Sequence, residues 1–228
     1  APATLGTGSG GQLTANGSTT LNGNVTTVGS QQYASVVIAG NTTLTGSSVG
    51  ASGSTTQSGG ARTLTLDAAS ASLGAVTVNQ LTANGSTTLN GNDTTAGAQQ
   101  YDDVVIAANT TLSGASVAIV GTTTQTGTPS LEVNAATSSL GAVTVDKLTV
   151  NGTATLHGNV STGDTQQYAN VVLGADVQLA AAGGSDIDIT GTLTGAHALG
   201  TSAGGTTRLR GAVNIGSLTT GTLGGTEI

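Results

Sequence analysis

Few residues of this sequence have the side chains that catalysis requires. The chain of 228 residues has 11 acidic residues, four basic residues, two histidines and no cysteine. Disulfides and thiolate chemistry are therefore excluded. His157 and His197 have no Ser or Asp partner at a spacing that recurs along the chain, so no nucleophile–base pair is predicted. His157 replaces Asn22 and Asn90 of two similar segments, and we interpret it as an exposed corner residue.

Asp102 and Asp103 are the only adjacent pair of acidic residues. Two similar segments have Ala-Ser at 34–35 and Ala-Asn at 169–170 in their place. Catalytic carboxylates need a preserved pocket, so we interpret this pair as surface residues. The clustered Asp, Arg and Lys of polysaccharide-cleaving β-helices are also missing, and we predict no enzymatic activity, no catalytic residues and no cofactor.

Asp186 and Asp188 are two residues apart, like part of an oxygen-ligand loop for calcium. The Gly- and Asp-rich nonapeptide of calcium-binding β-rolls does not occur in the sequence. We therefore predict no metal site, and we expect both carboxylates to point outward beside Ile187 and Ile189.

The charge pattern and the short apolar runs argue against two classes of partner, nucleic acids and membranes. The formal net charge is −7, and the basic residues are Arg62, Lys147, Arg208 and Arg210. Without a basic patch, nucleic-acid binding has no electrostatic basis. No apolar run approaches the roughly 20 residues of a membrane span, so no membrane insertion is expected.

A thirteen-residue motif that occurs three times indicates how the chain is organised. QLTANGSTTLNGN occupies 12–24 and again 80–92, and KLTVNGTATLHGN occupies 147–159, at steps of 68 and 67 residues. Repeats of this kind are typical of solenoids and arrays. The predicted units are residues 1–72, 73–139 and 140–210, with a partial fourth unit or C-terminal end at 211–228.

The local pattern within each unit is that of short β-strands. Apolar and polar residues alternate at 64–66, 76–78, 131–133 and 187–189, which is the strand period. Asn-Gly pairs, which favour turns with positive φ, occur at 16–17, 22–23, 84–85, 90–91 and 151–152. We predict an all-β parallel solenoid in which equivalent small side chains stack on one another. Three coils of about 22 residues or four of about 17 fit one unit, and tandem β-sandwiches are the alternative.

The triplet Gln-Gln-Tyr recurs at 31–33, 99–101 and 166–168. One interpretation is an exposed tyrosine stripe that binds sugars or surfaces. We favour a structural role, with each Tyr packed over an edge or cap of the coil and the Gln amides forming ladders. Thr-x-Thr strings such as 63–65 also suggest ice binding, but Leu-Glu-Val replaces that string at 131–133.

The motif Asn-x-Ser/Thr, which marks candidate glycosylation sites, is frequent. A chain rich in Thr, Asn and Gly produces many such motifs by chance. The candidate residues are Asn16, Asn24, Asn41, Asn84, Asn92, Asn109, Asn151 and Asn159.

The repeat block resembles those of very large secreted bacterial proteins of the filamentous haemagglutinin type. The residues that carry the resemblance are LGAVTV at 73–78, TTAGAQQYDDVVIAANTTLSG at 94–114, STGDTQQYANVVLGADVQLA at 161–180 and GGTTRLRGAVNIGSLTTGTLGG at 204–225. The resemblance covers most of 12–180 and again 204–225. It implies a right-handed parallel β-helix, export from a Gram-negative or cyanobacterial-type cell, and a surface or matrix role. The secretion-signal domain of that family is not recognisable here.

From these features we predict a non-enzymatic extracellular or cell-surface rod with a structural or adhesive role in cell adhesion or biofilm. Its partner is then a host or matrix surface. The alternative is a filament subunit whose partner is a second copy, because both ends of a solenoid have unpaired strand edges. A longer chain cut at both ends remains a further interpretation. The residues of the candidate assembly interface are Thr7, Gly8, Ser9, Gly10, Ala212, Val213, Asn214 and Ile215.

Overall fold

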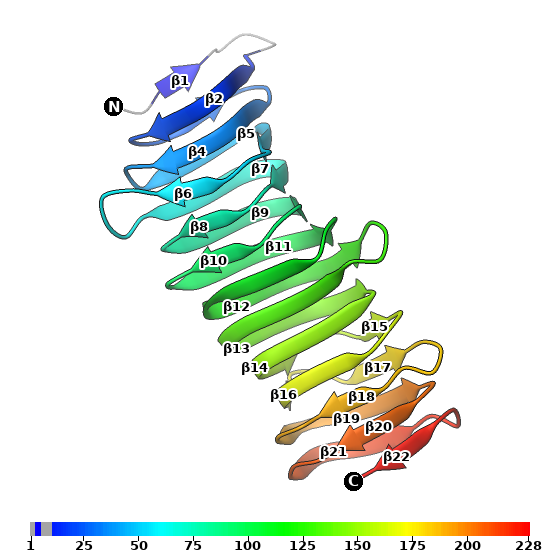
Figure 1. Cartoon of the computed structure of the whole chain (residues 1–228). Coiled ribbons are helices and arrows are strands. Elements are labelled where there is room, and N and C mark those ends of the chain that lie inside the picture. The colour runs from blue at the N-terminus through cyan, green and yellow to red at the C-terminus, as the bar shows by residue number, and fades with distance from the viewer. Residues whose placement is uncertain (1–2, 6–10) are drawn as a thin grey trace.

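The described residues wind into an elongated rod with residues 3–5 and 225–227 at opposite ends (Figure 1). This computed structural model describes the backbone of residues 3–5 and 11–228 and the side chains of 11–228. The described residues form strands and no helix. In chain order the strands are β1 (Ala3–Leu5), β2 (Leu13–Leu21), β3 (Val25–Thr27), β4 (Gln31–Ile38), β5 (Thr42–Ala51), β6 (Thr55–Gln57), β7 (Thr63–Leu73), β8 (Val76–Val78), β9 (Gln80–Leu89), β10 (Asp93–Thr95), β11 (Ala98–Ile106), β12 (Thr110–Gln125), β13 (Ser130–Val145), β14 (Lys147–Leu156), β15 (Val160–Thr162), β16 (Gln166–Leu173), β17 (Val177–Ala181), β18 (Ile187–Ile189), β19 (Leu193–Ala203), β20 (Thr206–Leu209), β21 (Val213–Thr220) and β22 (Gly225–Glu227).

The strands stack in parallel register to form a β-solenoid of about 11 coils. Starting at Leu13, each residue pairs with its equivalent one coil further on, 16 to 22 residues later, until Thr220 is reached after 11 steps. Parallel pairing along the whole rod excludes the tandem β-sandwich alternative, whose sheets are built from antiparallel strands.

Each coil contains three strand segments, and each segment belongs to one side of the rod. We call these sides faces I, II and III, in the order in which the chain visits them. Face I begins with residues 13–15, face II with 19–21 and face III with 25–27. In the next coil these segments pair with residues 31–33, 36–38 and 44–45.

The interior is narrow and is filled mostly by Val, Leu, Ile and Ala side chains. In β8 and β18 the outer two residues are buried and the middle one faces away from the core, as the alternating pattern predicted. Segments 64–66 and 131–133 follow the same rule, with their apolar residues inward. Val and Ile favour such strands because their branched side chains pack well on a pleated surface. A core one side chain deep explains why this chain folds without Phe, Trp or Met.

The 68-residue spacing does not correspond to a whole number of coils. Eleven strand segments separate Gln31 from Gln99 and again Gln99 from Gln166, which is three and two-thirds coils. Equivalent residues therefore move to another face: Tyr33 lies on face I, Tyr101 on face III and Tyr168 on face II. The expectation of three or four whole coils with self-stacking residues is wrong.

Stacking in the interior does not require the side chains of consecutive coils to be identical or small. Tyr33 lies between Ala15 and Ala51 of the adjacent coils, where small neighbours leave room for the ring. Tyr101 has Ala83 on one side and Ile119 on the other. Because all three faces accept the same inward pattern, a repeated sequence can occupy any of them.

The Asn-Gly pairs are not uniform turns. Those at 22–23 and 90–91 form bends between strands. Those at 16–17, 84–85 and 151–152 lie within β2, β9 and β14, where the strand register shifts. Among the five glycines only Gly85 has a positive φ, of 79°, so the expectation of positive φ at each pair is wrong for the other four.

Candidate functional site

The Gln-Gln-Tyr triplet places its first and third side chains inside the solenoid. Gln31 and Tyr33 are buried, whereas Gln32 faces outward. The Tyr33 hydroxyl donates to Gln31 Oε1 over 2.8 Å. Gln31 Nε2 donates to the carbonyls of Val25 at 3.1 Å and Thr45 at 2.7 Å. One amide thus joins its own strand on face I to two consecutive coils of face III.

The same cluster forms in the other two triplets. Gln99 Nε2 donates to the Asp93 and Ser113 carbonyls at 2.9 and 2.8 Å. Gln166 Nε2 donates to the carbonyls of Val160 and Ala180 at 3.4 and 2.6 Å. The phenol hydroxyls again donate to the Gln Oε1 atoms, at 3.1 Å for Tyr101 and 3.0 Å for Tyr168.

An exposed tyrosine stripe is therefore wrong, because the tyrosines are at most 2% exposed and lie on different faces. The prediction that the triplet has a structural role agrees with this burial, but the predicted positions and partners of its side chains are wrong. The rings lie within the coil, and the Gln amides bond to backbone carbonyls instead of to one another. Burial raises the pKa of Tyr33 to about 12 and raises the pKa values of Tyr101 and Tyr168 well above that of an ordinary phenol, with nearby Asp93 adding to the shift of Tyr101. The phenols are therefore neutral hydrogen-bond donors.

The second cluster differs from the others by one carboxyl group. Asp93 is fully buried, and the Tyr101 hydroxyl lies 2.6 Å from its Oδ2 atom. Asp93 Oδ1 has no hydrogen-bond partner among the described residues. Burial raises the pKa of Asp93 to about 7, although the Tyr101 hydroxyl and the backbone N–H of Val76 partly oppose this shift.

Asparagine and aspartate side chains line the edges between faces and connect consecutive coils. In each case Oδ1 accepts a hydrogen bond from a backbone N–H that lies 19 to 22 residues further on. The pairs are Asn24 with Thr43, Asn41 with Thr63, Asn92 with Thr111, Asn109 with Ser130, Asn159 with Gln178, Asn170 with Thr192, Asp103 with Thr122, Asp176 with Ala198 and Asp186 with Thr206.

Five of the eight candidate glycosylation asparagines belong to this set: Asn24, Asn41, Asn92, Asn109 and Asn159. The other three, Asn16, Asn84 and Asn151, lie in strands at the register shifts. Asn151 Nδ2, the atom to which a sugar would be attached, instead donates to Glu132 Oε1 at 2.9 Å. The Asn-x-Ser/Thr motifs thus coincide mostly with edge residues that have a structural role.

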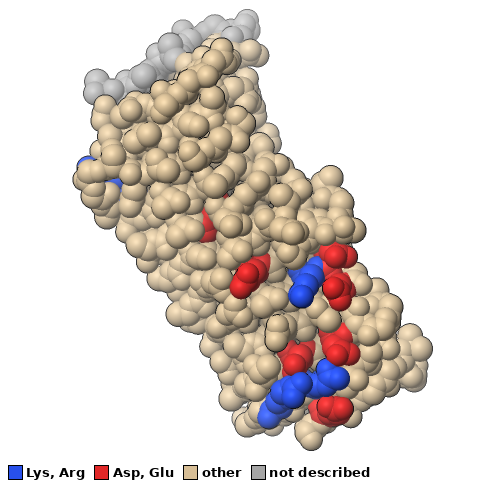
Figure 2. Space-filling view, viewed as in Figure 1, with Lys and Arg blue, Asp and Glu red and all other residues tan. Residues whose placement is uncertain are grey.

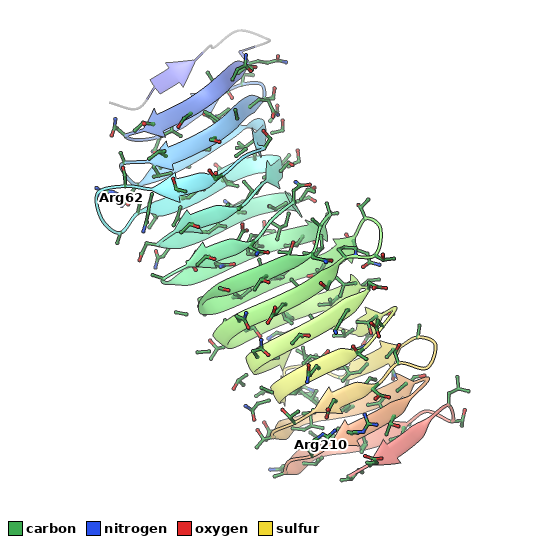
Figure 3. The ribbon with its side chains drawn as sticks, in the orientation of Figure 1. Arg62 and Arg210 are labelled. Carbon is green, nitrogen blue, oxygen red and sulfur yellow. The ribbon has the colours of Figure 1, made fainter. Side chains whose placement is uncertain are left out.

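The charged residues gather toward the C-terminal half of the rod in the view of Figure 2. Asp186 and Asp188 lie at the surface as expected, but each pairs with an arginine. Arg208 Nη1 lies 2.5 Å from Asp186 Oδ2, and Arg210 Nε lies 2.9 Å from Asp188 Oδ1. Figure 3 shows Arg210 in the last coils and Arg62 on a loop nearer the N-terminal end of the rod. The side chains described form no group of three or more candidate metal ligands.

The remaining titratable residues do not converge on a pocket. Asp102 and Asp103 are exposed and accept the backbone N–H groups of Gly85 and Thr122. His157 is an exposed residue at a bend, as predicted. The other histidine, His197, lies 3.5 Å from Asp176 at the surface. These positions bring together no nucleophile, base and acid.

The candidate assembly residues fall into two groups. Thr7, Gly8, Ser9 and Gly10 lie outside the described residues. In the second group, Val213, Asn214 and Ile215 begin β21, and Ala212 precedes it. β21 pairs with β19 on one side, and its inward residues Val213 and Ile215 remain partly uncovered.

The chain has no match among protein-family models, curated proteins or solved structures. In the described part of the chain there is no helix that is long and apolar enough to cross a bilayer.

Proposed function

We propose that this chain is a non-enzymatic, extracellular structural or adhesive rod of a bacterial surface or matrix protein. In this proposal it is a right-handed parallel β-helix with three repeats of about 68 residues and a partial fourth. The observation that carries the proposal is that its polar groups serve the scaffold. Edge Asn and Asp residues hold the next coil, and the inward Gln and Tyr residues join faces.

The polar exterior of the rod favours binding to a host or matrix surface over catalysis. No charged residue precedes Arg62 in the sequence, so the first coils present amides and hydroxyls. Such a surface forms many weak hydrogen bonds and does not depend on a single pocket. The repeated outward Gln residues, Gln32, Gln100 and Gln167, lie on three different faces. A flat crystalline ligand such as ice, which needs one regular face, is therefore disfavoured.

The proposal is tested by labelling intact source cells with antibodies against the purified chain and by measuring attachment to matrix-coated surfaces. Surface label and attachment that the soluble chain inhibits are expected. A broad glycan-cleavage screen provides the opposing test. Turnover that disappears in Asp102→Ala or Asp186→Ala would establish an enzyme and overturn the proposal.

A second candidate function is a subunit of a filament that assembles head to tail. The observation that favours it is the last coil, where Val213, Ile215 and Leu218 belong to the core but are only partly buried. At the other end Leu13 and Ala15 are partly buried in the same way. A further coil on the same axis, supplied by a second copy or by a longer chain, covers Val213, Ile215 and Leu218 and pairs with the open edge of β21.

Electron microscopy of the purified chain, with and without residues 211–228, tests this candidate. Uniform filaments that disappear on truncation are expected. Ile215→Glu places a charge at the apolar edge and also abolishes them, whereas Asn214→Glu, whose side chain is exposed, is the matched control. Soluble monomers of the full chain at high concentration exclude the filament.

A further inference from the structure

Asp93 is a buried carboxyl group that neither the packing nor the proposed function requires. It lies on face II between Val76 and Leu112 of the adjacent coils. The similar segments NVTT and NVST have Val25 and Val160 at the same position, and both valines are buried. An apolar side chain therefore satisfies the same site twice within this chain.

The hydrogen bonds around Asp93 require a proton that an ionised carboxylate lacks. The Tyr101 oxygen lies 2.6 Å from Asp93 Oδ2 and 3.1 Å from Gln99 Oε1, but a phenol has only one hydrogen to donate. Gln99 Nε2 is already engaged with two backbone carbonyls. Both contacts of the Tyr101 oxygen are satisfied when the Asp93 carboxyl donates to Tyr101 and Tyr101 donates to Gln99. The latter bond is the one seen in the other two clusters.

In the part of the chain that the structure describes, an ionised Asp93 has no cationic partner, and only the Tyr101 hydroxyl and the backbone N–H of Val76 oppose the cost of burying its charge. It takes the Tyr101 hydrogen, so Gln99 Oε1 loses its donor, and a buried charge without a partner is costly. The residues stacked on it from β8 and β12 are Val76 and Leu112, which are apolar. On β11 the one titratable group that contacts the Asp93 carboxyl is the Tyr101 phenol, which is neutral. Among the described residues, no Lys, Arg or His forms an ion pair with it.

We propose that Asp93 is a protonated carboxylic acid in the folded rod and that local opening of its coil depends on pH. The coil opens rarely in mild acid and more often as the pH rises toward neutral. The direction follows from proton linkage. A group that holds its proton more tightly in the folded chain stabilises the fold fully below its unfolded pKa, which is about 3.9 for Asp. That contribution is lost as the pH rises through the folded value of about 7.

The C-terminal coils respond in the opposite direction. Hydrogen bonds from the Thr206 backbone N–H and from Arg208 lower the pKa of Asp186. Asp186 therefore stabilises its coil above the ordinary Asp pKa, and this contribution is lost as the pH falls through the lowered value. The rod loosens near its middle at neutral pH and near its C-terminal end in acid.

The test uses the full chain in three forms: wild type, Asp93→Asn and Asp93→Val. Asn mimics the protonated acid, because its amide can donate to Tyr101. Carbon-13 NMR of labelled aspartates follows the Asp93 carboxyl, and amide hydrogen exchange, corrected for intrinsic rates, gives the opening constant of 76–112. Between about pH 5 and about pH 8 that constant is expected to rise about 100-fold in the wild type. It is expected to stay constant in Asp93→Asn, and the coils of Val25 and Val160 serve as internal references.

Two results overturn the proposal. The first is an Asp93 carboxyl that is already ionised at about pH 5. The second is the same pH dependence of opening in the wild type and in Asp93→Asn. If Asp93→Val or Asp93→Asn does not fold, the carboxyl titration of the wild type decides the question alone.

Discussion

Replacing Gln166 by Leu keeps the approximate size of the side chain and removes three interior hydrogen bonds. Two of them join Nε2 to the carbonyls of Val160 and Ala180, and the third joins the Tyr168 hydroxyl to Oε1. Each buried polar group left without a partner costs about 1–3 kcal/mol, and the apolar surface of Leu recovers about 1.5–3 kcal/mol. The Val160 contact is long at 3.4 Å and contributes least. We therefore expect the free energy of unfolding to fall by about 3 kcal/mol.

Guanidinium denaturation followed by circular dichroism measures this change. Gln167→Leu is the matched control, because Gln167 is exposed, and it is expected to change stability by no more than about 0.5 kcal/mol. The double variant Gln166→Leu/Tyr168→Phe removes the orphaned hydroxyl and is expected to recover about 1 kcal/mol. If Gln166→Leu is as stable as Gln167→Leu, the Gln amide does not hold the faces together and our account of the cluster is wrong.

Three further predictions concern the edges, the register shifts and acid. Asn41→Ala removes the side-chain oxygen that accepts from the Thr63 backbone N–H, and we expect the free energy of unfolding to fall by about 1 kcal/mol. Asn41→Asp keeps this acceptor and is expected to lose less. If both variants lose the same stability in thermal unfolding, the hydrogen bond does not have this role. Gly85→Ala forces a side chain into positive φ and against the Ala68 carbonyl, and we expect a loss of about 2 kcal/mol or more by the same assay. Its control is Gly23→Ala, where an added Cβ meets nothing within 4 Å. Because its pKa is lowered, Asp186 should make hydrogen exchange in the last coils rise on acidification, and Asp186→Asn should abolish that rise.

The strands and their inward residues were predictable because alternation is a local property. Val76 and Val78 flank the polar Thr77 in the sequence, and both valines are buried in the structure while Thr77 is exposed. The number of coils in a unit was not predictable, because it depends on how many residues each corner uses. Steps of 16 to 22 residues per coil occur within one rod, and no sequence rule separates them.

The buried Gln-Tyr clusters could be recognised only in part. Alternation places Gln31 and Tyr33 on the same side of a strand, but polar Gln is usually exposed, and the carbonyls that it satisfies belong to Val25 and Thr45 in other coils. The edge residues had a usable signal that we missed. Asn or Asp stands directly before a strand segment whose first residue points inward, as at Asn24 and Asn41.

The shift of one face per sequence unit has a consequence for the gene. Near-identical repeats recombine, and loss of one unit removes eleven strand segments, which is not a multiple of three. The coil continues without a break, because every face accepts the same inward residues, but everything downstream rotates by a third of a turn. Variation in repeat number would thus re-aim the arginine–aspartate cluster formed by Arg208 and Asp186 about the long axis while it changes the length of the rod.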